Sequence, residues 1–330
     1  ANLQIIEEAL LDLAPSLGEG VVVANKSTVP VGTVERFQAM LEDVGSKAVV
    51  VSNPEFLREG SALHDFFEPD RIVVGTRDEH AGALMRELYE GVERPFILTD
   101  PASAEMIKYA SNAYLATRIT FANAIANLCE AVDADALDVL EGMGLDHRIG
   151  THFLNPGPGF GGSCFPKDSL ALVAIAEASG YDFSLLRGVI HVNELQTERI
   201  VRKVIDAVAD PATARVALWG LSFKAGTDDV RESPAVKLAA RLVDLGVHVV
   251  AFDPKASPPP GLAIDIAPSA LDSLDDADVL LIATEWPSFR QVTPPRIAER
   301  LAGNTVIDAR NLLDPTEVAA AGLEYIGVGR

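Results

Sequence analysis

The residues most able to do chemistry lie in one glycine-rich stretch and at the start of the helix after it. Residues 155–168, NPGPGFGGSCFPKD, contain four glycines and three prolines, which predicts a loop open to close approach by a ligand. Pro166 suits a first helical turn, so we expect Cys164 at a helix N-terminus, where the helix dipole favours the thiolate. Cys164 is therefore a candidate nucleophile, and Asp168, one turn later, is a candidate for holding water.

Other interpretations of this stretch stay open on the residues alone. A Gly/Pro loop before a helix is commonly a simple connection, and a free cysteine is commonly a small buried apolar residue. The substring GPGFGG, residues 157–162, also satisfies the GxGxxG fingerprint of dinucleotide binding. However, no apolar strand precedes it and a proline occupies a variable position, so it does not predict a pyrophosphate site of Rossmann type.

Carboxylates, a lysine and an amide occur at spacings that suit a site around that thiol. Glu55 and Glu59, in the segment 53–60, would share a face if the segment were helical, as general base and water-holding group. Lys108 and Asn112 have the same spacing in a long helical pattern, and a cation beside an amide donor suits an oxyanion. Each pair is also consistent with an ordinary solvated surface.

A first candidate ligand segment lies at the end of the predicted strand in residues 21–27. It consists of Ser27, Thr28 and Val29. Ligands of open α/β sheets bind outside the carboxyl ends of the strands, which is where these residues would lie. The alternative is an ordinary strand-to-helix turn in which the hydroxyl groups cap the helix.

A second candidate segment supplies cations to an otherwise acidic chain. Lys224 and Arg231 lie in GLSFKAGTDDVRESP, which joins a predicted strand to a predicted helix at the position where such folds bind nucleotides. Arg310 ends a later strand and is a third candidate cation. Arg148, ahead of the glycine-rich stretch, either meets a phosphate or caps a helix.

The elements that must position these residues fall into three stretches. Residues 1–100 alternate strand and helix, which predicts a parallel sheet covered by helices. Residues 101–209 are helical and include the pattern 102–134, of a length typical of a domain connection or an oligomer interface. Residues 210–330 alternate again. The predicted fold is α/β, with two Rossmann-like doubly wound parallel-sheet domains joined by a long central helix and an all-α middle region.

We expect the first of these domains to be incomplete. A Rossmann domain begins with a strand, a Gly-rich turn and an acidic residue for the ribose, whereas this sequence opens with a helical pattern over residues 3–17. The first 100 residues therefore predict the second half of a dinucleotide-binding domain.

Composition narrows the classes of partner. The net charge of −21 argues against nucleic acid and anionic membranes, because binding to either needs clustered Lys and Arg. The apolar runs are of strand length, so no membrane span is expected. Two cysteines, 129 and 164, form neither a disulfide framework nor a metal-binding pattern, and the histidines lack metal spacing. With no signal peptide, a reducing cytoplasm is the expected location.

Taken together, the motifs resemble those of the UDP-glucose/GDP-mannose dehydrogenase family, which oxidises the sugar alcohol of a nucleotide sugar to an acid. They occur in the family's order and spacing and cover essentially the whole chain: KSTVP, NPEFLREG, EMIKYASNA, DHRIG, PGPGFGGSCFPKD, GLSFKAGTDDVRES, TEW and DARN. The resemblance implies oxidation of the C6 hydroxyl of UDP-glucose to UDP-glucuronate with two NAD and one water.

The resemblance also implies catalytic roles. Cys164 would attack the intermediate aldehyde to give a thiohemiacetal, which loses hydride to become a thioester. Lys108 and Asn112 would stabilise the oxyanions, and Asp168 would help to activate water. The remaining implied catalytic residues support hydrolysis of the thioester and its water network: Glu59, Glu55 and Thr28.

Ligand contacts are implied for residues in all three stretches. Sugar and phosphates would contact Glu55, Phe56, Leu57, Arg58, Glu59, Lys108, Asn112, Arg148, Asn155, Gly157, Gly159, Phe160, Gly161, Phe223, Lys224 and Arg310. NAD would contact Ser27, Thr28, Val29, Glu59, Cys164, Lys167 and Arg231. The resemblance further implies a homodimer or higher homo-oligomer through the long helix, in which Arg148 reaches the neighbouring subunit's site. No metal is implied.

The sugar is set by the branch of the family. GGSC differs from the GGHC of the N-acetylmannosamine branch, and FFEPDRIVVG is similar to the UDP-glucose branch, whereas SFKAGTDD also occurs in the mannose branch. UDP-glucose oxidation is the leading hypothesis. The alternatives are GDP-mannose oxidation and a non-catalytic module that binds a nucleotide sugar.

Overall fold

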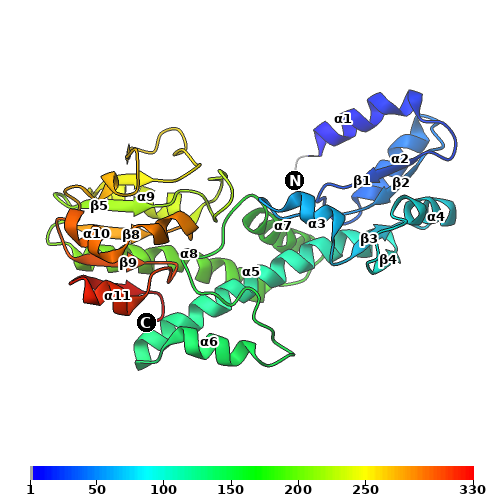
Figure 1. Ribbon diagram of the computed structural model, residues 1–330. Helices are drawn as coiled ribbons and strands as arrows, with labels where there is room; N and C mark the ends of the chain where they lie inside the picture. Colours follow the sequence, from blue (N-terminus) through cyan, green and yellow to red (C-terminus); the bar gives the residue numbers. More distant parts are fainter. Residues whose placement is uncertain (1–2) are drawn as a thin grey trace. The chain divides into compact units, whose positions relative to one another are not determined.

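Strands and helices alternate at both ends of the chain, and only helices occupy its middle (Figure 1). The computed structural model describes residues 3–330; residues 1 and 2, which the predicted first domain includes, lie outside the described residues. The chain packs as two units. One comprises residues up to Ala113 together with Asp168–Phe183, and the other comprises Tyr114–Lys167 and Ser184–Arg330. The predicted α/β class is confirmed, while the predicted division at residues 100 and 209 stays a prediction.

The first unit contains a four-stranded sheet in the order β1-β2-β3-β4. Its strands and helices follow one another as α1 (Gln4–Leu13), η1 (Ala14–Ser16), β1 (Val22–Asn25), α2 (Thr33–Asp43), β2 (Val49–Ser52), α3 (Ala62–Phe67), β3 (Ile72–Gly75), α4 (Glu79–Leu88) and β4 (Phe96–Thr99). Every strand that the sequence predicts in this region is present. Val51, Val73 and Val74 are fully buried, as expected for central strands with both faces covered.

One strand pair in this unit differs from the all-parallel expectation. β1 and β2 are parallel, and so are β3 and β4, but β2 and β3 are antiparallel and meet at the single pair Ser52 and Gly75. The connection between β2 and β3 holds only the six-residue helix α3, which is too short to run back along the sheet as a parallel crossover helix does. The expectation of a uniformly parallel sheet is therefore wrong at this pair.

Four longer helices form the middle of the chain: α5 (Pro101–Val132), α6 (Ala136–Gly144), α7 (Phe165–Ala178) and α8 (Ser184–Ala207). The 32-residue α5 confirms the long helix predicted from the sequence, and no strand lies between residues 101 and 209 of the described chain. Its buried face is rich in alanine, with Ala104, Ala116, Ala122 and Ala126 all inaccessible to solvent. Because alanine side chains are short, neighbouring backbone can approach this helix closely.

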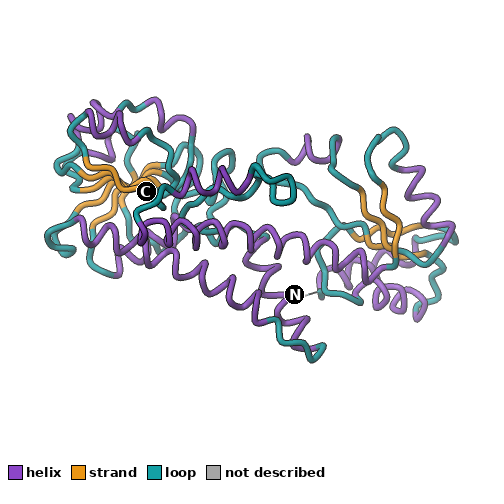
Figure 2. Tube along the Cα trace, turned by 90° about the horizontal axis from the view of Figure 1, so that it is seen from below, coloured by secondary structure: helices purple, strands orange, loops and turns teal. Residues whose placement is uncertain are grey.

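The second unit contains a six-stranded sheet in which every pair is parallel (Figure 2). Its strands are β5 (Arg215–Trp219), β6 (His248–Phe252), β7 (Asp265–Ile266), β8 (Val279–Ile282), β9 (Thr305–Asp308) and β10 (Glu324–Gly327). The order β7-β6-β5-β8-β9-β10 is 3-2-1-4-5-6 in chain order, which is the doubly wound Rossmann arrangement. The predicted second Rossmann-like domain is thus confirmed in topology.

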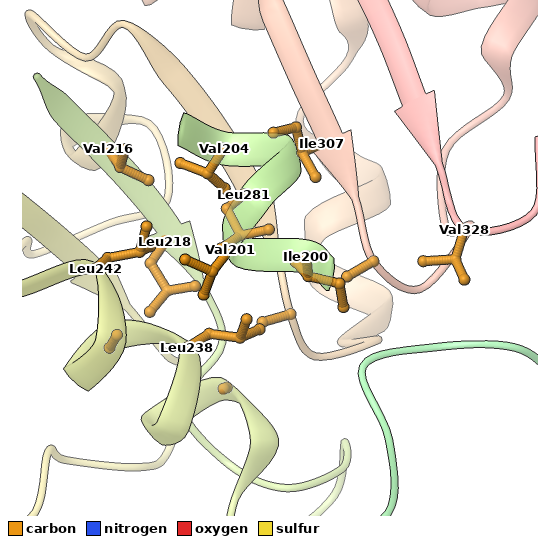
Figure 3. Close-up of a cluster of buried hydrophobic side chains, with 14 of the residues drawn as sticks. Ile200, Val201, Val204, Val216, Leu218, Leu238, Leu242, Leu281, Ile307 and Val328 are labelled. Carbon is orange, nitrogen blue, oxygen red and sulfur yellow. The ribbon is translucent and has the colours of Figure 1, made fainter. Parts of the chain in front are cut away.

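Both faces of this sheet are covered by apolar layers. On one face, side chains of β5, β8 and β9 pack against α8 and against α9 (Pro234–Asp244), as Figure 3 shows for Val201, Leu218 and Leu238. On the other face, Trp219 packs against Phe289 in a layer completed by two short 3-10 helices and by α10 and α11. These elements are η2 (Asp272–Leu274), η3 (Pro287–Gln291), α10 (Pro294–Arg300) and α11 (Pro315–Ala320).

The α9 layer yields a test of where stability resides. Leu238 of α9 is fully buried in the layer shown in Figure 3, whereas Leu245, just after the same helix, is 43% exposed. We expect Leu238→Ala to lower the free energy of unfolding by about 2–5 kcal/mol, because it removes buried methyl groups and leaves a cavity. Leu245→Ala should change it by less than about 1 kcal/mol. Urea unfolding of both variants measures this, and equal losses would contradict the assignment of the core.

Candidate active site

One face of α5 buries three polar side chains in the first unit. Glu105, Lys108 and Asn112 follow one another at helical spacing and are 3%, 5% and 7% exposed. Burying such groups is costly unless each has a polar partner. The partners of this stripe are consequently the parts of the structure that decide what the site can do.

Lys108 is held by the segment that follows β2. Its Nζ donates a hydrogen bond to the backbone oxygen of Glu55 at 2.7 Å and lies 3.5 Å from the Glu55 carboxylate. It also lies 5.2 Å from the centre of the Phe56 ring, and the guanidinium of Arg71 stacks on that ring at 3.6 Å. The structure therefore places Glu55, Phe56 and Lys108 together, as the sequence predicts, and fixes a buried ammonium beside them.

Asn112 is held by the first turn of α7. Its Nδ2 donates to Asp168 Oδ2 at 2.6 Å, and Asp168 is only 1% exposed. Burial raises the pKa of the nearby Tyr109 phenol to about 12, with the Asp168 and Glu105 carboxylates adding to the shift. Asn112 and Asp168, predicted to act together, are therefore in direct contact, and a neutral phenol lies beside them.

Cys164 is the residue immediately before α7, so its predicted position at a helix N-terminus is confirmed. Its side chain is exposed, and Ser163 Oγ lies 3.6 Å from Sγ. Asp168 is the fourth residue after it. The convergence of Cys164 with Lys108 and Glu59 stays a prediction of the sequence.

The segment carrying Glu55 and Glu59 is not helical. Residues 53–58 have no regular structure and α3 begins only at residue 62, so the two carboxylates do not share a helical face. Pro54 disfavours a helical conformation in the residue before it, and Glu55 Oε2 accepts the Leu57 N–H in a local turn. The pairing of Glu55 with Glu59 on one helical face, expected only if the segment were helical, is therefore absent.

Arg58 makes its main contact with Asp65. Its Nε and Nη2 donate to the two Asp65 oxygens at 3.0 and 2.6 Å, and this pairing holds the pKa of the Asp65 carboxyl well below its usual value. Leu57, also predicted to contact the sugar, has an exposed side chain. Contacts of Arg58 and Leu57 with a ligand remain predictions.

Sequence reasoning missed the part played by Glu105. Its carboxylate accepts the N–H groups of Gly32 and Val34 at 2.6 and 2.9 Å, and so caps the N-terminus of α2 from another helix. Burial raises the pKa of this carboxyl. The loop before α2 contains Ser27, Thr28 and Val29, so Glu105 fixes the end of that loop. The sequence feature that could have indicated a role for Glu105 is its spacing of three residues from Lys108, which places both on one face of the helix.

A second group of predicted residues lies together within the second unit. We call residues 155–162 the glycine loop. A Cβ on Gly161 would lie 2.2 Å from the backbone oxygen of Glu232, and one on Gly162 would lie 2.9 Å from the Phe223 ring. These positions therefore require glycine. The loop packs closely against the segment between β5 and α9, as the shared ligand role of the two segments requires.

Arg310 links this group to the carboxyl ends of β5 and β8. Its Nε donates to the backbone oxygen of Ala283 at 2.9 Å, and its Nη2 donates to that of Phe223 at 3.0 Å. Glu285 lies 3.0 Å from Nε, and Lys224 Nζ lies 5.3 Å from the centre of the Phe223 ring. The structure thus gathers two cations and an aromatic ring where doubly wound folds bind ligands.

Asp253, at the end of β6, holds the loop that carries Phe223 and Lys224. It accepts the N–H groups of Leu221 and Ser222 at 2.8 and 3.0 Å, and the Trp286 indole N–H at 3.1 Å. Burial alone would raise the pKa of this carboxyl, but the donated backbone N–H groups outweigh it and hold the pKa below its ordinary value. Sequence reasoning missed this residue as well.

Several predicted ligand residues are exposed. Arg148 and Arg231 each pair with an aspartate two residues earlier, Asp146 and Asp229 respectively. Asn155 and Lys167 have exposed side chains. Within residues 3–330, no group of three or more acidic, histidine or cysteine side chains could hold a metal ion. No helix in that range is long and apolar enough to cross a membrane.

Comparison with known proteins places these features in one family. Three models of the UDP-glucose/GDP-mannose dehydrogenase family match the chain: the NAD binding domain at residues 1–93, the central domain at 102–195 and the UDP binding domain at 217–315.

Individual relatives match the chain over its whole length. It is 42% identical to UDP-glucose 6-dehydrogenase TuaD of Bacillus subtilis and 40% identical to the UDP-glucose 6-dehydrogenase of Rickettsia typhi. These matches cover 100% of the chain and 73% and 78% of the two relatives. The structure superposes on a UDP-glucose dehydrogenase from Pyrobaculum islandicum with a TM-score of 0.90 at 36% identity, covering 100% of this chain and 76% of that one.

The residues of the first unit fit the nicotinamide end of NAD. The loop after β1 presents the hydroxyl groups of Ser27 and Thr28 at the carboxyl edge of the sheet, and Asn25 Nδ2 donates to the Ser27 backbone oxygen at 3.1 Å. Among residues 3–330 no strand leads through a Gly-rich turn into a helix in the way that holds a pyrophosphate.

The charge of Asp253 makes a testable contribution to stability. Asp253→Asn puts an NH₂ group against backbone N–H donors, so we expect it to lower the free energy of unfolding at neutral pH by about 1–3 kcal/mol. Because the folded pKa lies below the ordinary value of 3.8, this contribution is complete above pH 3.8 and is lost as pH falls through the folded pKa. Urea unfolding across this range should show the gap between the two proteins narrowing.

Asp244→Asn serves as the control for that measurement, because the Asp244 side chain is 67% exposed in the same unit. A pH-independent difference between wild type and Asp253→Asn would contradict a role for the charge.

Proposed function

This chain belongs to the UDP-glucose/GDP-mannose dehydrogenase family of NAD-dependent oxidoreductases, and on that basis we propose that it oxidises UDP-glucose to UDP-glucuronate. The observation that carries this proposal is the polar group at the start of α7. Lys108 and Asn112 are buried together on α5, and Asn112 contacts an aspartate four residues after an exposed cysteine at a helix N-terminus. The substrate is supported by the names of relatives that match the whole chain.

Recognition of the nucleotide sugar is assigned to the second unit and to the Glu55 segment. Lys224 and Arg310 supply positive charge for the diphosphate, and Phe223 supplies an apolar surface beside them. The glycine loop lies beside Arg310 and Phe223. Sugar hydroxyls would be met by polar groups of the segment 55–59 and by Lys108 and Asn112.

The chemistry proceeds through the cysteine. Bound NAD supplies the hydride acceptor for both oxidations. In the first, Lys108 and Asn112 stabilise the alkoxide that develops as the C6 hydroxyl becomes an aldehyde. The Cys164 thiolate then adds to the aldehyde carbon, and the resulting thiohemiacetal gives up a second hydride to become a thioester.

Hydrolysis of that thioester regenerates the thiol. A water molecule, activated with the help of Asp168, adds to the thioester carbonyl, and the C–S bond breaks to release the carboxylate. Glu59 assists this step. Thr28 and Glu55 hold the water network, and the buried Lys108 ammonium offsets the negative charge on the tetrahedral oxygen.

Cofactor contacts are proposed for residues on both sides of the thiol. Ser27, Thr28 and Val29 would meet the nicotinamide riboside, and Glu59 and Cys164 would lie at its reactive face. Lys167 and Arg231 are exposed cations that suit the phosphates of NAD.

Association of two copies is proposed through α5. Tyr114, Phe121 and Leu128 are spaced by seven residues and are 61%, 50% and 58% exposed, so they form one apolar stripe along the helix. An exposed stripe of this kind is typical of an interface. In the dimer Arg148 would reach the partner's site. A cytoplasmic location is also proposed, since both cysteines are unpaired.

Calorimetric titration of the full chain tests the substrate. We expect UDP-glucose and UDP to bind, and GDP-mannose to bind at least tenfold more weakly, because the site is built for one nucleotide. Addition of NAD with UDP-glucose should yield NADH in a ratio of two per sugar oxidised. A folded chain that does not bind UDP-glucose, or that binds GDP-mannose more tightly, would contradict the proposal.

Alkylation of the thiol tests the nucleophile. Cys164 is exposed at the start of α7 and is proposed to act as a nucleophile, so iodoacetamide should modify it at neutral pH several times faster than a small free thiol, and UDP-glucose should slow the reaction. Cys164→Ser should abolish labelling and formation of UDP-glucuronate. Cys129→Ser is the control, because Cys129 is buried and should not contribute. Labelling at the rate of an ordinary thiol would argue for a non-catalytic binding module.

A further inference from the structure

We propose that four carboxamide side chains outside the predicted site hold the glycine loop in the shape that receives the nucleotide sugar. They are Asn123 and Asn127 of α5 and Asn193 and Gln196 of α8. The inference rests on the proposed function, because it takes the glycine loop to be part of the nucleotide-sugar site. These are positioning residues, which act through the loop backbone.

Both backbone polar groups of Gly157 are hydrogen-bonded to carboxamide side chains. Its N–H donates to Asn123 Oδ1 at 2.7 Å, and its oxygen accepts from Gln196 Nε2 at 2.9 Å. Asn123 and Gln196 are 1% and 2% exposed, so neither bond competes with water. The buried Asn123 Nδ2 has no hydrogen-bond partner among residues 3–330, which makes the bond to Gly157 the principal polar contact of that side chain.

Asn127 fixes the orientation of the Gln196 carboxamide. Its Nδ2 donates to Gln196 Oε1 at 2.9 Å, so the other end of the Gln196 amide, the Nε2 donor, is turned toward the Gly157 oxygen. A carboxamide has distinct donor and acceptor ends, and a partner on one end removes the alternative orientation. Asn127 therefore acts on the loop indirectly, through Gln196.

Phe160 is held in the same manner by a single side chain. Its N–H donates to Asn193 Oδ1 at 2.8 Å, and Asn193 Nδ2 donates to its oxygen at 3.1 Å. The amide of Asn193 thus pairs with one loop residue as a neighbouring strand would. Two residues of the loop, Gly157 and Phe160, are consequently fixed through both the N–H and the oxygen.

The opposite side of the loop faces Arg310 and Phe223, which are proposed to bind the nucleotide. A Cβ on Gly157 would lie 3.4 Å from the Ala309 backbone oxygen and 3.5 Å from Arg310 Nη1, while Gly162 abuts Phe223. The carboxamides therefore set where the loop lies relative to Arg310 and Phe223. Ordering a backbone costs about 1–2 kcal/mol per residue, and a Gly-rich loop has more freedom to lose than most. Neutral amides restrain it without adding a charge that would compete for an anionic ligand.

The test combines loop dynamics with ligand affinity in the full chain. Gln196→Met removes the donor to the Gly157 oxygen, and Asn193→Ala removes both bonds to Phe160. We expect faster hydrogen exchange of the Gly157 amide in the first and of the Phe160 amide in the second, with protection of β5 and β8 unchanged. The Kd for UDP-glucose should rise at least tenfold, which is about 1.4 kcal/mol. Thr197→Val, at a buried neighbour of Gln196 on α8, should leave the Kd within twofold.

Two results would overturn the inference. One is a variant whose loop amides exchange faster but whose Kd for UDP-glucose is that of wild type. The other is wild-type loop exchange in both variants. Loss of protection in β5 and β8 would mean that the variant has lost its fold; Gln196→Glu, which keeps the acceptor for Asn127 but removes the donor to Gly157, then gives the decisive comparison. Failure of the proposed function is distinguishable, since wild type itself would then bind no UDP-glucose.

Discussion

The arrangement depends on one constraint: the charged and carboxamide side chains that α5 buries need partners from elsewhere in the chain. Glu105, Lys108 and Asn112 find them at the start of α2, in the segment after β2 and in the first turn of α7. Further along the same helix, Asn123 Oδ1 accepts a hydrogen bond from the glycine loop. Because unpaired buried polar groups are costly, each partner segment is held in one place. The helix thereby determines where the loops with chemical functions lie within their own units.

The second unit uses a dinucleotide-binding topology in an altered way. In such folds an acidic residue after the second strand commonly receives a ribose. Here the corresponding carboxylate, Asp253 after β6, accepts N–H groups of the turn after β5 and the indole of Trp286. The carboxylate is occupied by the protein itself, and the proposed contacts of this unit with an anionic ligand lie with Lys224 and Arg310. This agrees with the match of residues 217–315 to a UDP binding domain.

Much of this structure could be predicted from local sequence. Short apolar runs located the strands, helical spacing located α5, and Pro166 located the start of α7 beside Cys164. Other features depend on distant partners and leave no local pattern. Asn193 and Gln196 resemble any polar residues on a helix until residues more than 30 positions away meet them. The helical pairing of Glu55 with Glu59, which the spacing allowed only if the segment were helical, is not present because Glu55 accepts the Leu57 N–H in a local turn.

The placement of the two tryptophans has a practical consequence for spectroscopy. Trp219 and Trp286 are the chain's only indoles, and both lie in the second unit at 0% and 7% exposure. Tryptophan emission therefore reports on the second unit alone, and unfolding of the first unit would not change it. Since the Trp286 indole N–H bonds to Asp253 and Ser222, its emission maximum also serves as a built-in optical reporter of the turn that carries Phe223.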